Sequence, residues 1–353
     1  MSRAWFTKAL LPWYAEHKRP LPWRGTRDPY RIWLSEVILQ QTRVEQGRAY
    51  WHRFVVTYPS VAELAAASED HVLRLWQGLG YYSRARNLRM AAQQVMDEHK
   101  GKFPASYEEL KGLKGVGDYT AAAIGSIAFG LAEPVVDGNV YRVLARVFGI
   151  DTPIDSTSGR KQFRELAATL IDPKQPGEHN QAVMELGARV CTPLKPRCGE
   201  CPLARKCIAR ASDRIAKLPV KAGKTKVRTR HFNYLHIERT GKTFLRKRAG
   251  QDIWQGLYEL PLIETEESMT KARFEARLTK ELGKGWKIQE VHGPVKHVLS
   301  HQLIHASFWE VQPPKGFRAP KDWVLVAESK LNGHAVPRLI ERYLHERSLR
   351  ERH

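Results

Sequence analysis

Residues 110–129 have the sequence LKGLKGVGDYTAAAIGSIAF, which predicts two helices joined by a short turn rich in glycine. Gly112, Gly115 and Gly117 follow the end of the first helix, and an alanine-rich second helix begins near Asp118. Glycine lets the backbone approach a ligand closely, and the N–H groups at a helix start can bind a phosphate. Because glycines are also common in ordinary turns between helices, this segment indicates a nucleic-acid-binding hairpin only in combination with other features.

The chain carries a large excess of positive charge. Its 58 lysines and arginines outnumber its 37 aspartates and glutamates, which gives a net charge of +21. Residues 191–230 contain twelve basic and two acidic residues, so this segment alone supplies +10. A basic linker in solvent is the simpler interpretation of that segment, but the total charge and its clustering favour binding to a nucleic acid.

The length of 353 residues predicts about two domains, and an apolar content of 42% predicts a folded chain. No apolar segment approaches the ~18 residues of a membrane span. The first twenty residues lack the apolar region of a signal peptide. We therefore expect a reducing, intracellular compartment, in which clustered cysteines more often bind metal than form disulfides.

The first two hundred residues show the periodicity of helices joined by short turns. Asp28 is expected to cap a helix that has Pro29 at its first position. The segment VYRVLARVF at 140–148 places its apolar residues on one helical face. This periodicity stops near 210–230, in a segment that resembles a connector.

A different pattern follows the connector. In residues 230–248, polar and apolar side chains alternate on both sides of a Thr-Gly pair, as expected for a β-hairpin. The segments IWQGLYELPLI at 253–263 and HASFWEVQP at 305–313 are further strand candidates. The sequence therefore predicts an α-helical domain followed by an α+β domain, without internal repeats.

All four cysteines lie in one short segment, CTPLKPRCGECPLARKC at 191–207. Cys191, Cys198, Cys201 and Cys207 have the spacing C-x6-C-x2-C-x5-C. A zinc site usually shows two close pairs of ligands, whereas only Cys198 and Cys201 form one here. One loop that supplies four thiolates suits a compact iron–sulfur cluster, so the spacing favours iron–sulfur and leaves zinc open. A redox disulfide is less favoured because all four cysteines share one basic loop.

Two acidic residues have the pattern of a catalytic pair. Glu36 shares a predicted helical face with apolar residues, so it is either a boundary residue with its carboxyl group in water or a buried acid. In the second case burial raises its pKa, and it can donate a proton near neutral pH. Asp137 precedes a helix, where an N-cap is the common role and the ionised form is favoured. One neutral and one anionic carboxyl group together can cleave a glycosidic bond through an oxocarbenium-like state.

Six segments carry a family resemblance: LSEVILQQT at 34–42, GLGYYSRARNL at 78–88, LKGVGDYTA at 113–121, VVDGNVYRV at 135–143, NQAVMELGARVC at 180–191 and the cysteine loop. Together they resemble the adenine DNA glycosylases of the MutY family, within the helix-hairpin-helix glycosylase superfamily. The resemblance covers nearly the whole chain. It implies a base-excision repair enzyme of bacterial type that removes adenine mispaired with 8-oxoguanine or guanine. It also implies a 4Fe–4S cluster bound by the four cysteines.

The resemblance implies a multidomain fold, in which a mostly α-helical helix-hairpin-helix glycosylase domain precedes an α+β Nudix-like domain. We expect the glycosylase domain at residues 1–210, with its hairpin at about 105–130 and its iron–sulfur loop at 191–207. A basic connector is expected at 211–229, and a Nudix-like domain that recognises 8-oxoguanine at 230–353. We also expect a monomer that acts on double-stranded DNA in the bacterial cytoplasm, associated with the nucleoid and without membrane contact.

By the same resemblance, Glu36 protonates the flipped adenine, and Asp137 stabilises the cationic sugar or attacks it transiently before water completes hydrolysis. Asn139 and Tyr119 are similar to the residues that hold this centre in place. Tyr119 occupies the position at which bifunctional relatives carry a catalytic lysine. A phenol cannot form the Schiff base of a lyase step, so we expect a monofunctional glycosylase. Lys111 precedes the hairpin turn and is expected to face phosphate.

Further residues resemble the substrate contacts of the family. The adenine pocket is expected to consist of Trp23, Arg24, Leu39, Val44, Gln181 and Met184. Ordinary packing is the alternative, above all for the apolar members of this set. The residues expected to contact DNA or the lesion are Gln41, Thr42, Tyr81, Gly115, Gly117, Ser300 and His301. Gln41 and Tyr81 resemble side chains that fill the base stack beside the lesion, with an ordinary buried aromatic as the alternative for Tyr81.

The C-terminal domain departs from active Nudix enzymes. ARFEARLTKELG at 272–283 replaces the acidic run that binds metal in those enzymes, so pyrophosphohydrolase activity is not expected. Ser300 and His301 match a family loop that recognises 8-oxoguanine, with a polar strand edge as the alternative. Leu299 stands where the family more often has phenylalanine, so the contact of that residue is left open.

Two functions of other classes remain open at this point. A bifunctional glycosylase/lyase of the endonuclease III type would act on oxidised pyrimidines and would need a lysine nucleophile in the hairpin. An iron–sulfur protein that binds DNA without catalysis would lack the carboxylates. The C-terminal domain argues against the first alternative, and the presence of Glu36 and Asp137 argues against the second.

Overall fold

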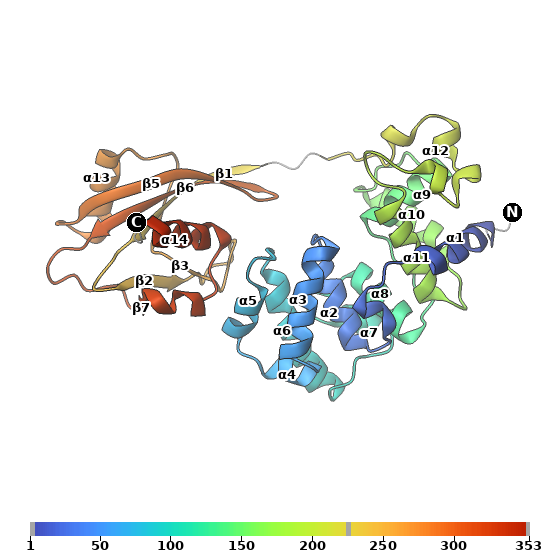
Figure 1. The fold of residues 1–353 in the computed structure, drawn as a ribbon, viewed down its shortest axis with the longest axis horizontal. Helices are drawn as coiled ribbons and strands as arrows, with labels where there is room; N and C mark the ends of the chain where they lie inside the picture. Colours follow the sequence, from blue (N-terminus) through green and yellow to red (C-terminus); the bar gives the residue numbers. More distant parts are fainter. Residues whose placement is uncertain (1–3, 224–226, 351–353) are drawn as a thin grey trace. The chain divides into compact units, whose positions relative to one another are not determined.

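The computed structural model describes residues 4–223 and 227–350 (Figure 1). The chain forms two compact units. The first consists of Met1–Ala66 and Asn87–Gly223, and the second of Ala67–Arg86 and Lys224–His353. In the described ranges, no helix is both long enough and apolar enough to cross a membrane.

The first unit is α-helical. Helix α6 (Ser83–His99) begins in the second unit and continues into the first. The other elements of the first unit are α1 (Ala4–His17), η1 (Pro22–Gly25), α2 (Pro29–Leu39), α3 (Val44–Thr57), α4 (Val61–Ala66), α7 (Tyr107–Gly112), α8 (Asp118–Phe129), α9 (Gly138–Phe148), α10 (Thr157–Leu170), α11 (Pro176–Arg189), η2 (Cys198–Glu200), η3 (Ala204–Lys206), α12 (Ile208–Ala211) and η4 (Ile215–Lys217).

Local sequence signals place the starts of these helices. The side chain of Asp28 accepts a hydrogen bond from the backbone N–H of Tyr30, and Pro29 occupies the first position of α2, so both predictions are confirmed. The glycine-rich turn between α7 and α8 forms where it was predicted, and α8 begins at Asp118. The apolar face predicted at 140–148 lies on α9 and packs into the core of the first unit.

Helix α11 connects two groups of helices within the first unit. It packs against α8 of one group, in which α2 contacts α3 and α8, and α7 contacts α8. It also packs against α1 and α9 of the other group, which contains α10 and α12 (Figure 1). The contact between α11 and α9 is close because residue 187 is glycine. A Cβ atom at Gly187 would lie 2.6 Å from the Cβ atom of Asn139, so a side chain there would push the two helices apart.

The second unit contains two β-sheets. The four-stranded sheet has the order β4-β1-β6-β5, in which β1 and β6 are parallel and the other pairs antiparallel. The three-stranded sheet has the order β3-β2-β7 and is antiparallel. The elements are α5 (Glu69–Trp76), β1 (Arg228–His236), β2 (Lys242–Lys247), β3 (Tyr258–Glu259), β4 (Leu262–Thr265), α13 (Lys271–Leu282), β5 (Lys287–Val298), β6 (Gln302–Gln312), β7 (Trp323–Ala327), η5 (Glu328–Gly333) and α14 (Arg338–Arg350).

The predicted hairpin at 230–248 forms only at its tip. Thr240 and Gly241 have positive φ values of 50° and 69°, as a tight turn requires, and Arg239 and Lys242 exchange backbone hydrogen bonds. Beyond this turn the strands separate, because β1 pairs with β4 and β6, whereas β2 pairs with β3 and β7. The alternation of side chains predicted the strands but not their partners, which come from distant parts of the sequence. The other two predicted segments form β3 with β4, and β6.

Aromatic stacking fixes a helix on each face of the four-stranded sheet. Phe308 and Trp309 are neighbours in β6 and therefore point to opposite faces. Phe308 stacks on Tyr343 of α14 with the ring centroids 4.0 Å apart, and Trp309 stacks on Phe274 of α13 at 4.2 Å. Helix α14 thus packs between the two sheets, and α13 covers the outer face (Figure 1).

Candidate active site

One cavity of about 190 Å³ in the first unit collects the residues predicted for catalysis and for adenine binding. The predicted catalytic residues that line it are Glu36, Tyr119, Asp137 and Asn139. The predicted adenine-binding residues that line it are Trp23, Arg24, Leu39, Val44, Gln181 and Met184, and Thr42 lies among them. These side chains come from η1, α2, α3, α8, the start of α9 and α11. The packing of α11 against α8 and α9 brings the set together.

Glu36 is buried in this cavity, with 7% of its surface exposed. The hydroxyl group of Tyr119 donates a hydrogen bond of 2.5 Å to its Oε2 atom. Burial raises the pKa of Glu36 to about 7; the hydrogen bond from Tyr119 opposes this effect, and the charge of Asp137 adds to it. The hypothesis of a buried acid is therefore correct, and the alternative of a carboxyl group in water is wrong.

Asp137 caps α9 through three hydrogen bonds. Its Oδ1 atom accepts from the backbone N–H groups of Asn139 at 2.9 Å and Val140 at 2.8 Å. Its Oδ2 atom accepts from the side-chain amide of Asn139 at 2.8 Å. Burial raises the pKa of Asp137 above its ordinary value, although these hydrogen bonds lower it. The N-cap is confirmed, but the helix start does not set the ionisation of this group alone, because burial outweighs it.

Sequence reasoning missed Glu185, which is fully buried at the wall of the cavity. Its carboxylate accepts hydrogen bonds from Arg24 at 2.8 Å and from Arg19 at 2.8 and 2.7 Å. Burial acts to raise the pKa of Glu185, but the hydrogen bonds from the two arginines prevail and lower it to about 2. Glu185 follows Gln181 by one turn of α11, so helical spacing from a predicted pocket residue was the signal that could have found it.

Helix α9 also reaches the cysteine loop. The guanidinium group of Arg142 donates to Oδ1 of Asn139 at 2.8 Å and to the carbonyl oxygen of Cys191 at 2.6 Å. One turn later, the buried Arg146 places its Nη1 atom 3.4 Å from Sγ of Cys191 and 2.7 Å from the carbonyl oxygen of Thr192. The first turn of α9 and the cysteine loop are therefore connected by direct hydrogen bonds.

The four cysteines line one apolar cavity together with residues of α9 and α11. Its lining includes Cys191, Cys198, Cys201, Cys207, Val143, Val147, Leu186 and Ile215. Four sulfur atoms around one apolar space are the donor set of an iron–sulfur cluster. The guanidinium group of Arg146 beside Cys191 offsets the negative charge that thiolate ligands would bring. The residues present therefore fit such a group.

Gly115 and Gly117 of the hairpin have different structural roles. Gly115 has a φ of 76°, and a Cβ atom there would lie 2.6 Å from the Cβ atom of Asn87. Gly117 is the N-cap residue of α8 and makes no side-chain cap, which leaves N–H groups of the first turn available. The ammonium group of Lys111 lies 2.8 Å from Oδ1 of Asp118, and its contact with phosphate stays a prediction.

The remaining predicted residues do not line this cavity. Gln41 is exposed and has a φ of 57°. Tyr81 has a φ of 48° and is 45% exposed, so the alternative of an ordinary buried aromatic is wrong. Its hydroxyl group hydrogen-bonds to that of Ser300 within the second unit. Tyr81, Ser300 and His301 all line a cavity of about 510 Å³ in that unit, so three predicted lesion contacts come together.

Comparisons with known proteins match both units. The model of the HhH-GPD superfamily of base excision DNA repair proteins matches residues 34–169, and that of the NUDIX domain matches residues 233–346. The adenine DNA glycosylase of Buchnera aphidicola (strain APS) is 33% identical over 268 residues, which cover 76% of this chain and 77% of that protein. The human adenine DNA glycosylase is 48% identical over 214 residues, which cover 58% of this chain but only 39% of that protein. A solved thermostable thymine-DNA glycosylase is 29% identical, with a TM-score of 0.56 over 60% of this chain and 97% of that one.

The buried position of Glu36 predicts how stability depends on pH. Its pKa rises from 4.5 in the unfolded chain to about 7 in the folded one, so the folded state binds more protons and loses stability as pH increases across this range. Each pKa unit corresponds to about 1.4 kcal/mol, so Glu36→Gln is expected to remove a penalty of roughly 3 kcal/mol above neutral pH. Urea unfolding at pH 5 and pH 8 measures this difference. The exposed Glu98→Gln is the control, and equal pH dependence in both variants would contradict a raised pKa at Glu36.

Proposed function

Because the chain belongs to the adenine DNA glycosylase family, we propose that it acts as a monomer and removes adenine opposite 8-oxoguanine or guanine in duplex DNA. The observation that carries this proposal is the presence of the buried Glu36 and the half-buried Asp137 in one cavity with the residues predicted to hold adenine. An acid that titrates near neutral pH and a second carboxyl group are the pair that cleavage of a glycosidic bond requires.

Glu36 would act as the general acid. Its pKa of about 7 leaves a large fraction of the Glu36 carboxyl group protonated at neutral pH. A buried acid with this pKa can donate its proton to a bound base. Because Oε2 accepts the hydrogen bond from Tyr119, Oε1 is the atom that would carry the transferable proton. Protonation of a ring nitrogen makes adenine a neutral leaving group and weakens its bond to the sugar.

Asp137 would stabilise the sugar cation that forms as adenine leaves. The three hydrogen bonds from Asn139 and Val140 fix its carboxyl group, so no reorganisation is needed when positive charge develops. The charge of Asp137 also raises the pKa of Glu36, which couples the two groups. Attack by water on the cationic sugar then completes hydrolysis and leaves an abasic site.

Recognition of adenine would combine hydrogen bonds at the base edge with apolar contacts to its faces. Arg24 is held by Glu185, which leaves it little freedom to turn away from the cavity. The Oε1 atom of Gln181 accepts a hydrogen bond from Tyr14 at 3.3 Å, so its amide N–H groups remain for a ligand. Met184 lies against the Tyr119 hydroxyl group at 3.8 Å and adds an apolar contact. This arrangement suits a flat, polar-edged base rather than an extended ligand.

The cavity offers no amine for a lyase reaction. None of the residues that line it, all of which the structure describes, is a lysine. Tyr119 occupies the relevant place in the hairpin, and its phenol is engaged with Glu36. A Schiff base requires a nucleophilic amine, so hydrolysis without strand cleavage is the expected outcome.

Adenine excision is therefore expected to depend on both carboxyl groups. Glu36→Gln and Asp137→Asn should each slow single-turnover release of adenine by about 100-fold or more, because general acid catalysis and cation stabilisation are lost. Duplexes with adenine opposite 8-oxoguanine, treated with alkali, report the reaction as strand breaks, and gel shifts report duplex binding, which should persist. Asp97→Asn and Glu98→Gln, two exposed neighbours in α6, are the matched controls. Near-normal rates in either active-site variant, or strand breaks without alkali, would show that the assigned chemistry is wrong.

We also propose that Cys191, Cys198, Cys201 and Cys207 bind a 4Fe–4S cluster. Support comes from the convergence of the four thiols on one apolar cavity and from the guanidinium group beside Cys191. The family resemblance favours this group over zinc. The cluster would have a structural role, because it fixes the basic loop 192–206 and does not line the 190 Å³ cavity.

The purified protein is expected to be brown, with about four irons per chain. Iron and zinc analysis of protein purified anaerobically from iron-replete cells measures this. Cys198→Ala, which removes one ligand, should lose the visible absorbance, whereas substitution of the exposed Leu194 in the same loop should retain it. Stoichiometric zinc without iron would contradict the assignment.

We propose further that the second unit recognises the base opposite adenine. Ser300 and His301 are exposed on the turn between β5 and β6 and line the 510 Å³ cavity, where a base has access to them. A hydroxyl group and an imidazole ring offer donors and acceptors suited to the edge of 8-oxoguanine. Leu299 also lines this cavity. It packs against the hydrophobic core around α14, so it anchors the turn that carries Ser300 and His301.

Replacement of both Ser300 and His301 by alanine is expected to reduce the preference for 8-oxoguanine over guanine opposite adenine. Lost hydrogen bonds to a base edge are worth about 1–3 kcal/mol each, so the ratio of excision rates should fall by about tenfold or more. Single-turnover rates on the two duplexes measure the ratio. The exposed Ser329 and His345 of the same unit provide an alanine-substituted control pair. Unchanged discrimination in the test variant would mean that these two residues only complete the strand edge.

A further inference from the structure

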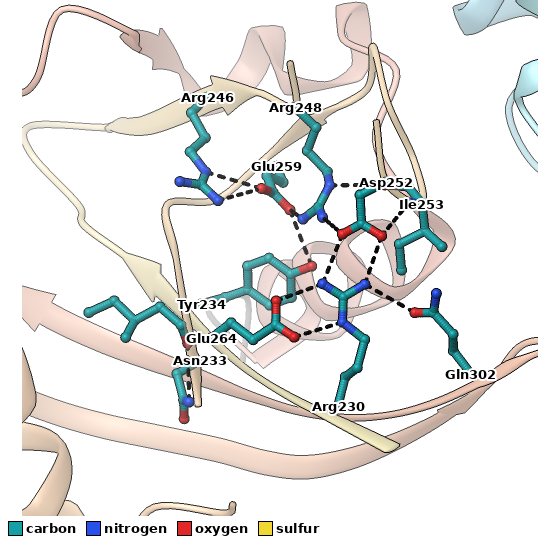
Figure 2. Close-up of polar contacts among 11 residues, drawn as sticks. Arg230, Asn233, Tyr234, Arg246, Arg248, Asp252, Ile253, Glu259, Glu264 and Gln302 are labelled. Atoms are coloured by element: carbon teal, nitrogen blue, oxygen red, sulfur yellow. Dashed lines mark hydrogen bonds and ion pairs between the residues drawn. The ribbon is translucent and has the colours of Figure 1, made fainter. Parts of the chain in front are cut away.

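A connected network of ion pairs lies inside the second unit, next to the turn that carries Ser300 and His301 (Figure 2). It consists of Arg230, Arg246, Arg248, Asp252, Glu259 and Glu264, with Tyr234 and Gln302 as neutral partners. Arg230 and Glu259 are buried, whereas Asp252 and Glu264 are exposed to solvent. A buried charge is costly unless it is paired, so the pairing of Arg230 calls for a physical reason.

Arg230 on β1 is the centre of the network. A guanidinium group has five N–H donors, and Arg230 uses all of them. Its Nε and Nη2 atoms donate to the two carboxylate oxygens of Glu264 at 2.7 and 2.6 Å. Its Nη1 and Nη2 atoms donate to those of Asp252 at 2.8 Å each, and Nη1 also donates to Oε1 of Gln302 at 3.1 Å. The guanidinium carbon of Arg230 lies over the ring of Phe232, 4.7 Å from its centroid, which adds an aromatic contact to the five hydrogen bonds.

These bonds join three separate segments. Glu264 belongs to β4, a neighbour of β1 in the four-stranded sheet. Asp252 lies in the loop between β2 and β3, and Gln302 is the first residue of β6, directly after His301. Arg230 is therefore the common partner of the 248–257 loop and of the turn that presents the proposed lesion contacts.

The 248–257 loop is held in a strained form by the same network. Trp254 has a φ of 60°, which is unfavourable for a bulky side chain. Arg248 donates hydrogen bonds to the carbonyl oxygen of Ile253 at 3.0 Å and to the carboxylate of Asp252 at 2.8 Å. These bonds fix the two residues that precede Trp254. The indole ring then packs edge-on against Phe232 and His297, at 6.2 and 5.7 Å between centroids.

The two segments that Arg230 joins form walls of the 510 Å³ cavity. Asp252, Ile253 and Trp254 line it from the loop, and Leu299, Ser300, His301 and Gln302 line it from the turn. The width of this cavity depends on the distance between these segments, and Arg230 contacts both. Arg230 holds the loop through a bidentate ion pair with Asp252 and the turn through one hydrogen bond to Gln302. Both contacts are directional, which a hydrophobic contact is not.

We propose that Arg230 is a positioning residue that sets the spacing between the Trp254 loop and the Ser300–His301 turn, and thereby the selectivity of this cavity for the base opposite adenine. The inference rests on the proposed function, because it assumes that Ser300 and His301 contact that base. Arg230 lines neither the 190 Å³ cavity nor the 510 Å³ cavity, so it would act through the residues that it holds. Its loss would leave the contacting side chains in place but without a fixed separation.

The chain offers a matched control in Arg246. Arg246 belongs to the same network and donates from Nε and Nη2 to a single oxygen of Glu259, Oε1, at 3.0 and 2.9 Å, but it contacts neither Asp252 nor Gln302. Lysine keeps the positive charge but cannot form two bidentate pairs. Arg230→Lys and Arg246→Lys both keep the positive charge and weaken the network, but only Arg230→Lys removes donors that bind Asp252 and Gln302, which lie in the two cavity walls.

The test measures selectivity and loop exchange in the full-length protein. Arg230→Lys is expected to lower the ratio of excision rates, 8-oxoguanine over guanine opposite adenine, by about tenfold, with the rate on the guanine duplex within about twofold of the parent. Hydrogen–deuterium exchange should increase in peptides that cover 249–256 and 299–304. Arg246→Lys should change neither measurement. Arg230→Met, which removes the charge as well, should show the same pattern more strongly.

The outcomes separate this inference from the proposed function. Unchanged selectivity in Arg230→Lys, while the alanine variant of Ser300 and His301 loses it, overturns the positioning role and leaves lesion recognition intact. Unchanged selectivity in both variants overturns lesion recognition and the positioning role with it. Equal loss of selectivity in Arg246→Lys also overturns the inference, because it would show a general effect of weakening the network. Loss confined to the Arg230 variants, with faster exchange in both peptides, supports it.

Discussion

The hydrogen bonds that Asp137 accepts from the first turn of α9 are the interaction on which the catalytic unit depends. They fix the start of a helix that carries Asn139 in its first turn and Arg142 and Arg146 in the turns that follow. Through these residues one helix holds a wall of the 190 Å³ cavity at its start and the cysteine loop along its length. A change at the Asp137 cap is therefore expected to shift residues of both the 190 Å³ cavity and the cysteine loop. The close contact at Gly187 sets how near α11 and its pocket residues can come to this helix.

Burial gives similar carboxyl groups different properties in the same cavity. Glu36 has one hydrogen-bond donor, the Tyr119 hydroxyl group, and burial raises its pKa to about 7. Glu185 is at least as deeply buried but meets two guanidinium groups, and its pKa falls to about 2. The partners account for the opposite directions of the two pKa shifts, because a full positive charge compensates desolvation where a hydroxyl group does not. The structure thus separates an acid that can release a proton from a carboxylate that anchors arginines.

The second unit uses charge in another way. Its network around Arg230 lies between β1, the 248–257 loop and the start of β6, where a purely apolar core would leave the loop free to shift (Figure 2). Directional ion pairs hold segments in fixed geometry at the expense of desolvation. The aromatic stacks of Phe308 and Trp309 provide the stability that such a network does not, because they bury large apolar surfaces on both faces of the sheet.

Local and short-range features could be predicted from the sequence, because they depend on neighbours in the chain. The caps at Asp28 and Asp137, the glycine-rich turn before α8, the cysteine loop and the presence of strands after the connector all follow from spacing and residue type. The family motifs also identified side chains that line one cavity. Only the tertiary structure decided which strands pair, that Glu36 is buried, that Glu185 anchors Arg24, and that Arg230 joins two loops. The physical reason is that desolvation, ion pairing and sheet order are set by groups distant in the sequence, which meet only when the chain has packed.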